Sequence, residues 1–513
     1  MTPRTVLRVP RILLASVLAL GGLGLAAPLD AQGSPEARTA AYLASIRDRT
    51  PQLIGFLREM PKGGDLHNHL SGAVYAESFL RWAAQDSLCV VVSTLSLTRS
   101  PCTPTEDSIP AAAAMYSSSL YGQLIDAWSM RNWNPARPKS GHDQFFDTFG
   151  KFGATERRTG DMLAEATSRA ASGRLSYMEL MSTLDGSGSA GLGAQVGYDS
   201  AFGVMRDRLL AAGLRDTAAK ARRSLTRVEA RRDTVLGCGT AQADPGCAVT
   251  VRWIYQVSRG RQPAQVYAQI LMGFEMASTD PRVVGFNLVQ PEDGLVSMRD
   301  FSLQMRMIQY LRGLYPNVRP TLHAGELAPG LVPPEGLRFH IRESVRVAGA
   351  RRIGHGVDIM NEDSALALLR EMAERRVMVE IALTSNAVIL GVAGRDHPLH
   401  VYLAHGVPVA LATDDEGVAR SEMTMEYVRA VQEQELDYRT LKMMARNSLE
   451  YAFVEGASLW SDARRFVPVA ACAAGAGGLG SRRCQAFTAG SVKARLQAEL
   501  ERGFEEFERR PRP

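Results

Sequence analysis

The chain has 513 residues, of which 45% are hydrophobic and 22% are charged, and these values exclude a largely disordered or low-complexity protein. Its formal net charge of +5 is too small a surplus to predict binding to nucleic acid or to an anionic membrane surface. The length allows one large domain or several ordinary ones.

The first 31 residues have the pattern of a cleaved secretory signal peptide. Arg4, Arg8 and Arg11 precede an apolar run over residues 12–27, and small residues follow it. That run is shorter than the roughly 20 residues that a membrane-spanning helix needs, although an uncleaved membrane anchor is the alternative. The pattern predicts a secreted or periplasmic protein without stable membrane insertion.

Residues 32–60 predict a helical lead-in, because apolar side chains recur there at helical spacing. Eight short apolar runs follow, and helical patterns separate most of them, most clearly at 295–318 and 363–375. The runs cover residues 65–70, 175–182, 250–257, 283–289, 319–323, 352–358, 378–383 and 408–413. Apolar strands that alternate with helices are typical of βα units with a parallel sheet. Eight such units predict an α/β fold, a closed (β/α)8 TIM barrel over residues 61–460.

Three segments are longer than simple connections require. Residues 86–140 and 236–248 are predicted insertions in the barrel, and residues 461–513 are a predicted C-terminal extension with a final helix near 491–509. Each segment holds one near pair of cysteines. The pairs are Cys89 and Cys102, Cys238 and Cys247, and Cys472 and Cys484. In an exported protein their proximity predicts three local disulfides, and reduced, partly buried cysteines are the alternative.

Polar side chains gather where the predicted strands end. His67 and His69 close the first strand, His323 ends the fifth, and the sixth and eighth strands lead into His355 and into the pair Asp414 and Asp415. The carboxyl ends of the strands form the face on which barrel enzymes carry their sites. The sequence therefore predicts that these side chains meet at one face of the barrel.

The spacing of these residues suits a metal ion. Residues i and i+2 of a strand point to the same side, so His67 and His69 can aim at one ion, and His323 and Asp414 can complete the set. A Zn²⁺ ion lowers the pKa of a bound water to about 7. Glu326, three residues after His323, is close enough to pass a proton to a substrate, and His355 and Asp415 can orient or deprotonate the water.

Each motif is weak evidence by itself, because single histidines are often structural and an Asp-Asp pair is often a turn or a helix cap. Their joint occurrence at the ends of four predicted strands is much stronger. No Lys lies between residues 221 and 441, where binuclear barrel hydrolases carry a carboxylated Lys that bridges two metals. A single metal ion is therefore favoured.

These residues resemble the adenosine deaminase family of metal-dependent barrel deaminases. The resemblance spans about residues 55–460. It rests on Met60-Pro61-Lys62-Gly63, His67-Asn68-His69-Leu70, Tyr177-Met178-Glu179, His323-Ala324-Gly325-Glu326, Ile353-Gly354-His355-Gly356, Thr384-Ser385-Asn386 and Thr413-Asp414-Asp415. Export and the paired cysteines make the chain look more like the secreted, growth-factor-related branch than the compact cytosolic one. Members of that branch are often dimers through added N-terminal helices, which makes residues 32–60 a candidate homodimer contact.

The resemblance implies one Zn²⁺ per chain, held by His67, His69, His323 and Asp414. It implies attack of hydroxide on C6 of a purine, with Glu326 donating a proton to N1 and with His355 and Asp415 positioning the hydroxide. Ammonia leaves, so that adenosine, and also 2′-deoxyadenosine, gives the inosine product.

The residues expected around the substrate are Ser71, Gln290, Gly325 and Asp415, and two of them depart from the family pattern. Ser71 stands where the family usually has an Asp that can bind the ribose, and Gln290 replaces a Gly that approaches the purine edge. These departures leave the sugar and the identity of the substrate open. The alternatives are a deaminase of a modified adenosine, another amidohydrolase reaction, and a non-catalytic secreted protein that binds nucleosides.

Overall fold

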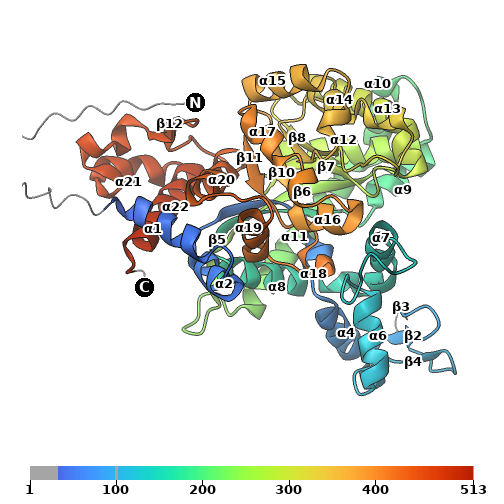
Figure 1. The fold of residues 1–513 in the computed structure, drawn as a ribbon. Helices are drawn as coiled ribbons and strands as arrows, with labels where there is room; N and C mark the ends of the chain where they lie inside the picture. Colours follow the sequence, from blue (N-terminus) through green and yellow to red (C-terminus); the bar gives the residue numbers. More distant parts are fainter. Residues whose placement is uncertain (1–32, 99–101, 512–513) are drawn as a thin grey trace, which may run out of the picture.

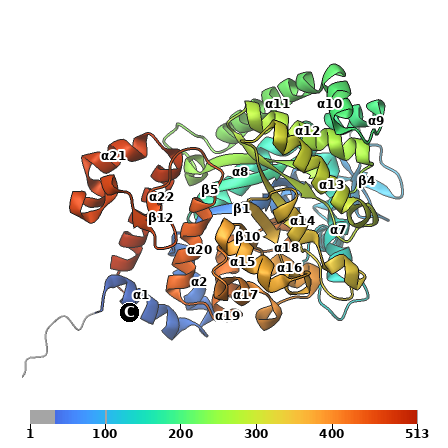
Figure 2. The same ribbon diagram turned by 90° about the horizontal axis from the view of Figure 1, so that it is seen from above.

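The computed structural model describes residues 33–98 and 102–511, and the predicted signal peptide lies outside them. Eight parallel strands form one sheet in which each strand pairs with the next along the chain (Figures 1 and 2). The strands are β1 (Gly63–His69), β5 (Leu175–Ser182), β6 (Thr250–Ser258), β7 (Val283–Val289), β8 (Arg319–Ala324), β9 (Arg352–His355), β10 (Met378–Ile381) and β11 (Val409–Leu411). The predicted TIM barrel is confirmed, and each of the eight predicted runs overlaps one of these strands.

The barrel closes where β11 meets β1. Asp414 donates its backbone N–H to the carbonyl oxygen of His67 at 2.9 Å, and His69 donates its own to the carbonyl oxygen of Asp414 at 3.0 Å. Below them, the buried carboxylate of Asp65 accepts hydrogen bonds from Thr413 Oγ1 at 2.5 Å and from Asn68 Nδ2 at 3.3 Å. Few contacts therefore join the two ends of the sheet, and they lie directly beside the predicted metal ligands.

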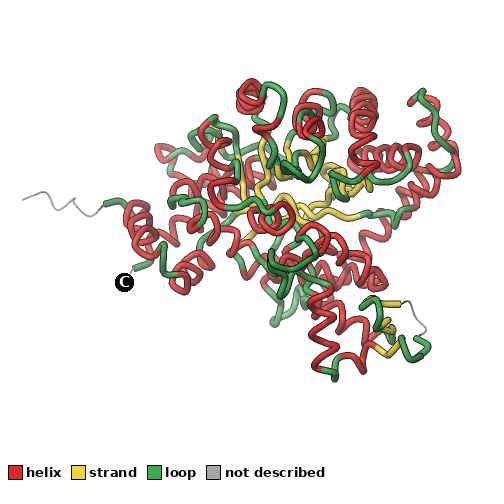
Figure 3. Tube along the Cα trace, turned by 45° about the vertical axis from the view of Figure 1, so that its right-hand side comes forward, coloured by secondary structure: helices red, strands yellow, loops and turns green. Residues whose placement is uncertain are grey.

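Helices surround the strands (Figure 3). Those of the barrel are α3 (Leu70–Ala73), α8 (Thr159–Ser172), α9 (Gly188–Val196), α10 (Phe202–Ala211), α11 (Leu214–Val235), α12 (Pro263–Thr279), α13 (Leu295–Leu314), α14 (His340–Arg346), α15 (Ala365–Arg375), α16 (Leu383–Leu390), α17 (Leu399–Ala404), α18 (Glu416–Ala419), α19 (Met423–Gln432) and α20 (Tyr438–Glu450). In α13, Phe301, Met305, Ile308 and Leu311 are buried at helical spacing, which explains why the sequence pattern there was readable.

The segment 86–140 projects from the barrel beside α4 (Ala76–Gln85), at the lower right of Figure 1. It contains a small antiparallel sheet and two helices: β2 (Cys89–Val91), β3 (Ser96–Thr98), β4 (Ser108–Pro110), α5 (Ala111–Ala114) and α6 (Ser118–Ala127). A disulfide joins Cys89 to Cys102. The next helix, α7 (Gly141–Phe152), leads back to the barrel. Cys238 and Cys247 form the second disulfide, in the loop after α11.

The two ends of the described chain pack together on one side of the barrel (Figure 2). The N-terminal helices are α1 (Pro35–Ile46) and α2 (Thr50–Glu59), and the C-terminal extension contains β12 (Trp460–Asp462), β13 (Val467–Pro468), α21 (Arg482–Ala489) and α22 (Val492–Arg509). The rings of Phe56 and Phe507 lie 5.0 Å apart, centre to centre. The third disulfide joins Cys472 to Cys484, so all three sequential pairings are confirmed. The homodimer contact at residues 32–60 stays a prediction.

Within the described ranges, no helix combines the length and the apolar character that crossing a membrane requires.

Candidate active site

Three histidines and one aspartate meet at the carboxyl ends of β1, β8 and β11. His67 Nε2 lies 3.0 Å from His323 Nε2 and 3.3 Å from Asp414 Oδ1, and His69 Nε2 lies 3.2 Å from each of the same two atoms. The four groups are buried or nearly so, and Asp414 Oδ1 has no hydrogen-bond donor although it is buried. Imidazole nitrogens and a carboxylate oxygen gathered around one point are a donor set that suits Zn²⁺, so this group could hold a metal ion.

Groups behind the four residues fix their orientation. Glu380 Oε2 lies 2.7 Å from His67 Nδ1, and Asn287 Oδ1 lies 3.0 Å from His323 Nδ1. Because these oxygens accept, each Nδ1 carries the proton and the lone pair of each Nε2 faces the centre of the group. The Ser385 hydroxyl donates to Asp414 Oδ2 at 2.6 Å and leaves Oδ1 for a cation.

The carboxylate behind His67 belongs to a buried charge network inside the barrel. Arg352 donates from Nε to Glu380 Oε1 at 2.5 Å and from Nη2 to Glu179 Oε2 at 2.5 Å. Burial by itself would raise the pKa of Glu380, but Arg352 and His67 outweigh it and hold that pKa below its ordinary value. Glu380 therefore stays ionised and can accept from His67.

Sequence reasoning missed Asn287 and Glu380 as functional residues. Each is a polar residue in an otherwise apolar buried strand, β7 and β10 respectively, and that contrast was the available signal. Ser385 belongs to a quoted motif, but nothing in the sequence alone ties it to Asp414.

Glu326 reaches the same face from the loop after β8. Its carboxylate Oε1 lies 3.6 Å from His355 Nε2. Burial raises the pKa of Glu326 well above its ordinary value, and the charges of Asp414 and Glu292 raise it further. The raised pKa favours the protonated carboxyl, which is the form that a proton donor needs.

A second buried carboxylate shapes the backbone of this loop. Glu292 accepts the backbone N–H groups of Gly325 at 3.0 Å and of Glu326 at 2.9 Å, and its Oε1 lies 2.5 Å from His340 Nδ1. Gly325 has φ +76°, and a Cβ there would collide with the carboxylate of Asp358. Glycine is thus required where the chain turns from His323 to Glu326.

A chain of hydrogen bonds fixes the tautomer of His355. Leu399 N–H donates to His397 Nδ1 at 3.2 Å, so that His397 carries its proton on Nε2, which lies 3.1 Å from Asn386 Oδ1. The amide orientation of Asn386 follows, and its Nδ2 donates to His355 Nδ1 at 2.9 Å. Burial lowers the pKa of His355 to about 3, so the ring is neutral and its only N–H is Nε2–H, which faces the site.

Asp415 follows Asp414 and is buried beside it. Its Oδ1 has no hydrogen-bond donor. A Cβ at Gly72 would overlap this oxygen, so the carboxylate of Asp415 lies directly against the backbone of α3. Burial, followed by the charge of Asp414, raises the pKa of Asp415 well above its ordinary value. A divalent cation at the four-residue group would oppose this shift through its positive charge.

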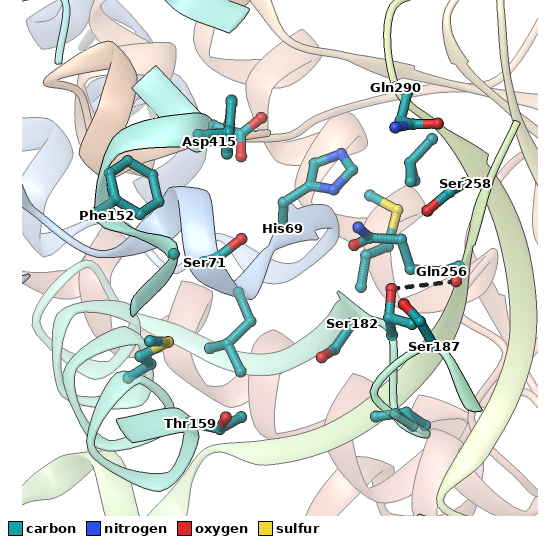
Figure 4. A pocket seen from close by; sticks show the side chains of 18 of the residues that line it. His69, Ser71, Phe152, Thr159, Ser182, Ser187, Gln256, Ser258, Gln290 and Asp415 are labelled. Atoms are coloured by element: carbon teal, nitrogen blue, oxygen red, sulfur yellow. Dashed lines mark hydrogen bonds between the residues drawn. The ribbon is translucent and has the colours of Figure 1, made fainter. Parts of the chain in front are cut away.

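A cavity of about 750 Å³ opens at this group, and Ser71, Gln290, Glu326 and Asp415 are among the residues that line it. Gln290 has φ +85°, and its side-chain Oε1 accepts from the backbone N–H of Gly260 at 2.9 Å (Figure 4). This hydrogen bond holds the Gln290 side chain against the backbone of Gly260, so Gln290 lines the cavity and does not fill it. Ser71 is exposed to the cavity and lies near His69 in the same view.

The chain matches a protein family over residues 204–458, and the description of that family is adenosine deaminase. The matched residues, just under half of the chain, resemble the adenosine deaminase family. His323, Glu326, His355, Asp414 and Asp415 lie within the matched residues, whereas His67, His69 and Ser71 lie before them.

Curated relatives match the same family over a short stretch. Adenosine deaminase of Salmonella heidelberg (strain SL476) is 38% identical over 135 residues, which are 26% of this chain and 37% of the relative. Adenosine deaminase of Escherichia coli (strain SE11) is 36% identical over the same shares. The match thus spans little more than a third of the length of these relatives.

Solved structures share the fold. The adenine deaminase of Arthrobacter aurescens has a TM-score of 0.52 at 18% identity and covers 87% of this chain and 99% of its own. The N6-mAMP deaminase of Arabidopsis has a TM-score of 0.52 at 19% identity, with 78% of this chain and 96% of its own covered.

Proposed function

We propose that the protein is a zinc-dependent hydrolase that deaminates a purine nucleoside, converting adenosine to inosine and 2′-deoxyadenosine to 2′-deoxyinosine, with release of ammonia. The observation that carries the proposal is the group of His67, His69, His323 and Asp414 with the buried Glu326 beside it. The match of residues 204–458 to the adenosine deaminase family supports the same reaction.

One Zn²⁺ ion is the cofactor that fits these donors, held by the three histidine Nε2 atoms and by Asp414 Oδ1. When bound, it supplies Lewis-acid chemistry that makes a nucleophile of water at neutral pH.

The protein side chains divide the proton transfers between them. His355 can only donate from Nε2, because Asn386 occupies its Nδ1, and it therefore orients the attacking oxygen and cannot deprotonate it. Asp415 Oδ1, which has no donor of its own, accepts the proton of the attacking water. Glu326 gives its proton to purine N1 as the oxygen adds to C6. Asp415 then returns its proton to the amino group, ammonia leaves as the C6–N6 bond breaks, and the hydroxyl proton of the adduct passes to Glu326 as the C6 carbonyl forms.

The first test is direct. Purified protein from residue 32 onward, loaded with one equivalent of Zn²⁺, is mixed with adenosine, and loss of the 6-amino group is followed by ultraviolet absorbance. Turnover that a chelator abolishes and that Zn²⁺ restores supports the proposal. A folded, zinc-loaded protein that binds nucleosides tightly without turnover would instead support the non-catalytic binding protein.

We further propose that the protein is exported, as part of the secreted branch of the family. The three disulfides among the described residues are compatible with an oxidising compartment. Expression of the full chain followed by fractionation tests this. Export requires the mature protein outside the cytoplasm, without residues 1–31 and with no free thiol, whereas a full-length protein in the membrane fraction would support the anchor.

A further inference from the structure

The cavity at the candidate active site continues beyond the residues that the proposed reaction uses. Four phenylalanines of α7, at positions 145, 146, 149 and 152, line it at helical spacing. Thr159 and Met162 of α8 and Ser224, Leu225 and Val228 of α11 form the facing walls. We call this part of the cavity, between α7, α8 and α11, the apolar chamber.

The walls of the chamber are fixed by contacts outside it. Arg231 of α11 donates from Nη2 to Asp161 of α8 at 2.7 Å. Glu229 of α11 accepts from the indole N–H of Trp253 at 3.2 Å, and Trp253 also lines the cavity. A Cβ at Gly160 would lie 2.5 Å from Arg231 Cβ, so α8 and α11 are in close contact. The chamber is therefore built into the fold before any ligand binds.

The charges of the cavity lie at one end. Its ionisable lining residues are His69, His323, Glu326, Asp414 and Asp415, all of which belong to the site described above. Among the described lining residues none is Lys or Arg. A phosphate group in the chamber would be buried without a cation, which is strongly unfavourable.

The orientation of the nucleoside decides which part of it reaches the chamber. C6 and N1 of the purine must face the metal-binding group and Glu326, and the sugar is attached at N9, on the other side of the purine. In Figure 4, Ser71 lies on the Phe152 and Thr159 side of His69. The hydroxyls of Ser71 and Ser182 make no hydrogen bond with the described residues and are free for the sugar.

We infer that the preferred substrate is an uncharged 6-aminopurine nucleoside that carries an apolar group on the 5′ carbon of its sugar, with that group in the apolar chamber. The inference rests on the proposed function. Ser71 suits such a substrate. A buried carboxylate at this position would need a hydrogen bond from a 5′-hydroxyl, whereas the neutral hydroxyl of Ser71 does not.

A substrate panel tests the inference on the unmodified, zinc-loaded protein. The probes are adenosine, 5′-deoxy-5′-(methylthio)adenosine, 5′-deoxy-5′-(benzylthio)adenosine, AMP and N6-benzyladenosine. We expect kcat/KM for the benzylthio compound to exceed that for adenosine by about tenfold or more, as burial of an apolar group in a fitted pocket allows. AMP should fall below adenosine by roughly a hundredfold or more.

A variant tests whether the preference for the benzylthio compound arises in the apolar chamber. Ser224→Phe fills the chamber from α11 and should lower the ratio of kcat/KM for the benzylthio compound over adenosine by about tenfold. Ala230→Phe, on the exposed side of the same helix, is the matched control and should leave the ratio unchanged. Calorimetry with 5′-deoxy-5′-(benzylthio)inosine against inosine measures the same preference without turnover.

The outcomes distinguish failure of the inference about the 5′ group from failure of the proposed deaminase function. If adenosine is deaminated but the 5′-apolar nucleosides are no better, or N6-benzyladenosine is the preferred probe, the inference is overturned and the proposed function stands. If no probe is turned over and the inosine derivatives bind equally, both fail.

Discussion

Glu326 is the residue on which the proposed chemistry depends most directly, because its proton must reach purine N1. Glu326→Gln keeps the size of the side chain but removes the transferable proton. We expect kcat to fall by about 10²–10⁴-fold with one zinc per chain retained. Metal analysis and steady-state kinetics on the same preparation check this, and a loss of only a few-fold would remove Glu326 from the role of proton donor.

The tautomer of His355 gives a second prediction for a single residue. Asn386→Asp replaces the amide that donates to His355 Nδ1 with a carboxylate that accepts, so the proton moves to Nδ1 and Nε2 can no longer donate. We expect kcat to fall by about 10²-fold while metal content is unchanged.

Nitrogen NMR of the labelled histidine ring reports the tautomer directly. Asn386→Gln, which retains an amide, is the conservative control and should keep the proton on Nε2. If Asn386→Asp leaves both the tautomer and kcat unchanged, the chain of hydrogen bonds does not control His355.

Residues at strand ends could be predicted from the sequence because a strand end is a local pattern. His67, His69 and His323 lie at the ends of predicted strands and Asp414 directly follows one, and the structure brings the four together. The residues that hydrogen-bond to these histidines could not be matched to them from the sequence. Glu380 meets His67, and Asn287 meets His323, only because the closed barrel turns the interior side chains of different strands toward one another.

Helix α7 carries an electrostatic contact that makes its stability depend on pH. His142 Nε2 lies 3.1 Å from Asp293 Oδ1, in the loop before α13, so the contact joins a wall of the chamber to the loop that follows Gln290. Asp293, and to a lesser degree Asp143, raise the pKa of His142 above its ordinary value of 6.5. The stabilisation is therefore fully present below pH 6.5 and is lost as the pH rises through the raised pKa.

We expect the α7 amides to open more readily at pH 8 than at pH 6, by about 1 kcal/mol or less, because the pair is only partly buried. Hydrogen exchange, corrected for the intrinsic pH dependence, measures this. His142→Gln keeps a donor to Asp293 without a titrating group and should show no such difference. An equal pH dependence in the variant would assign the effect to another group.

The ends of the elements show where local patterns fail. The run at 352–358 predicts a longer strand than β9, which stops at His355 because His355 and Gly356 both adopt positive φ, +67° and +60°. Asp414, after β11, has φ +58°. These backbone turns aim the site residues into the cavity, and an apolar pattern contains no signal for them.

At the scale of the whole molecule, the sequence predicted an N-terminal lead-in and a C-terminal extension but not that they pack on each other. Lys442 of α20 donates to Glu36 of α1 at 2.9 Å and to Glu508 of α22 at 2.6 Å. Such pairings depend on how the closed barrel places its first and last helices, which lie far apart in the chain. The insertions, by contrast, were recognisable from their length, and their disulfides from cysteines that are neighbours in sequence.

The closure of the barrel gives the last prediction, because the metal-binding group lies across the junction of β1 and β11. His67 and His69 come from one side of it and Asp414 from the other, and few backbone hydrogen bonds join the two. A bound ion would thus hold the ends of the sheet together. At a free Zn²⁺ concentration of about 100 times Kd, binding adds about 2.7 kcal/mol to the free energy of unfolding.

Removal of the metal by a chelator should lower the thermal midpoint and speed hydrogen exchange most at the amides of His69 and Asp414, which form the junction. The amide of Val257, on the β6 strand away from the junction, serves as the internal control and should change less. In Asp414→Asn the chelator should have little effect, because the anionic ligand is already missing. If metal removal loosens β6 as much as the junction, the ion stabilises the fold as a whole and does not specifically hold the ends of the sheet together.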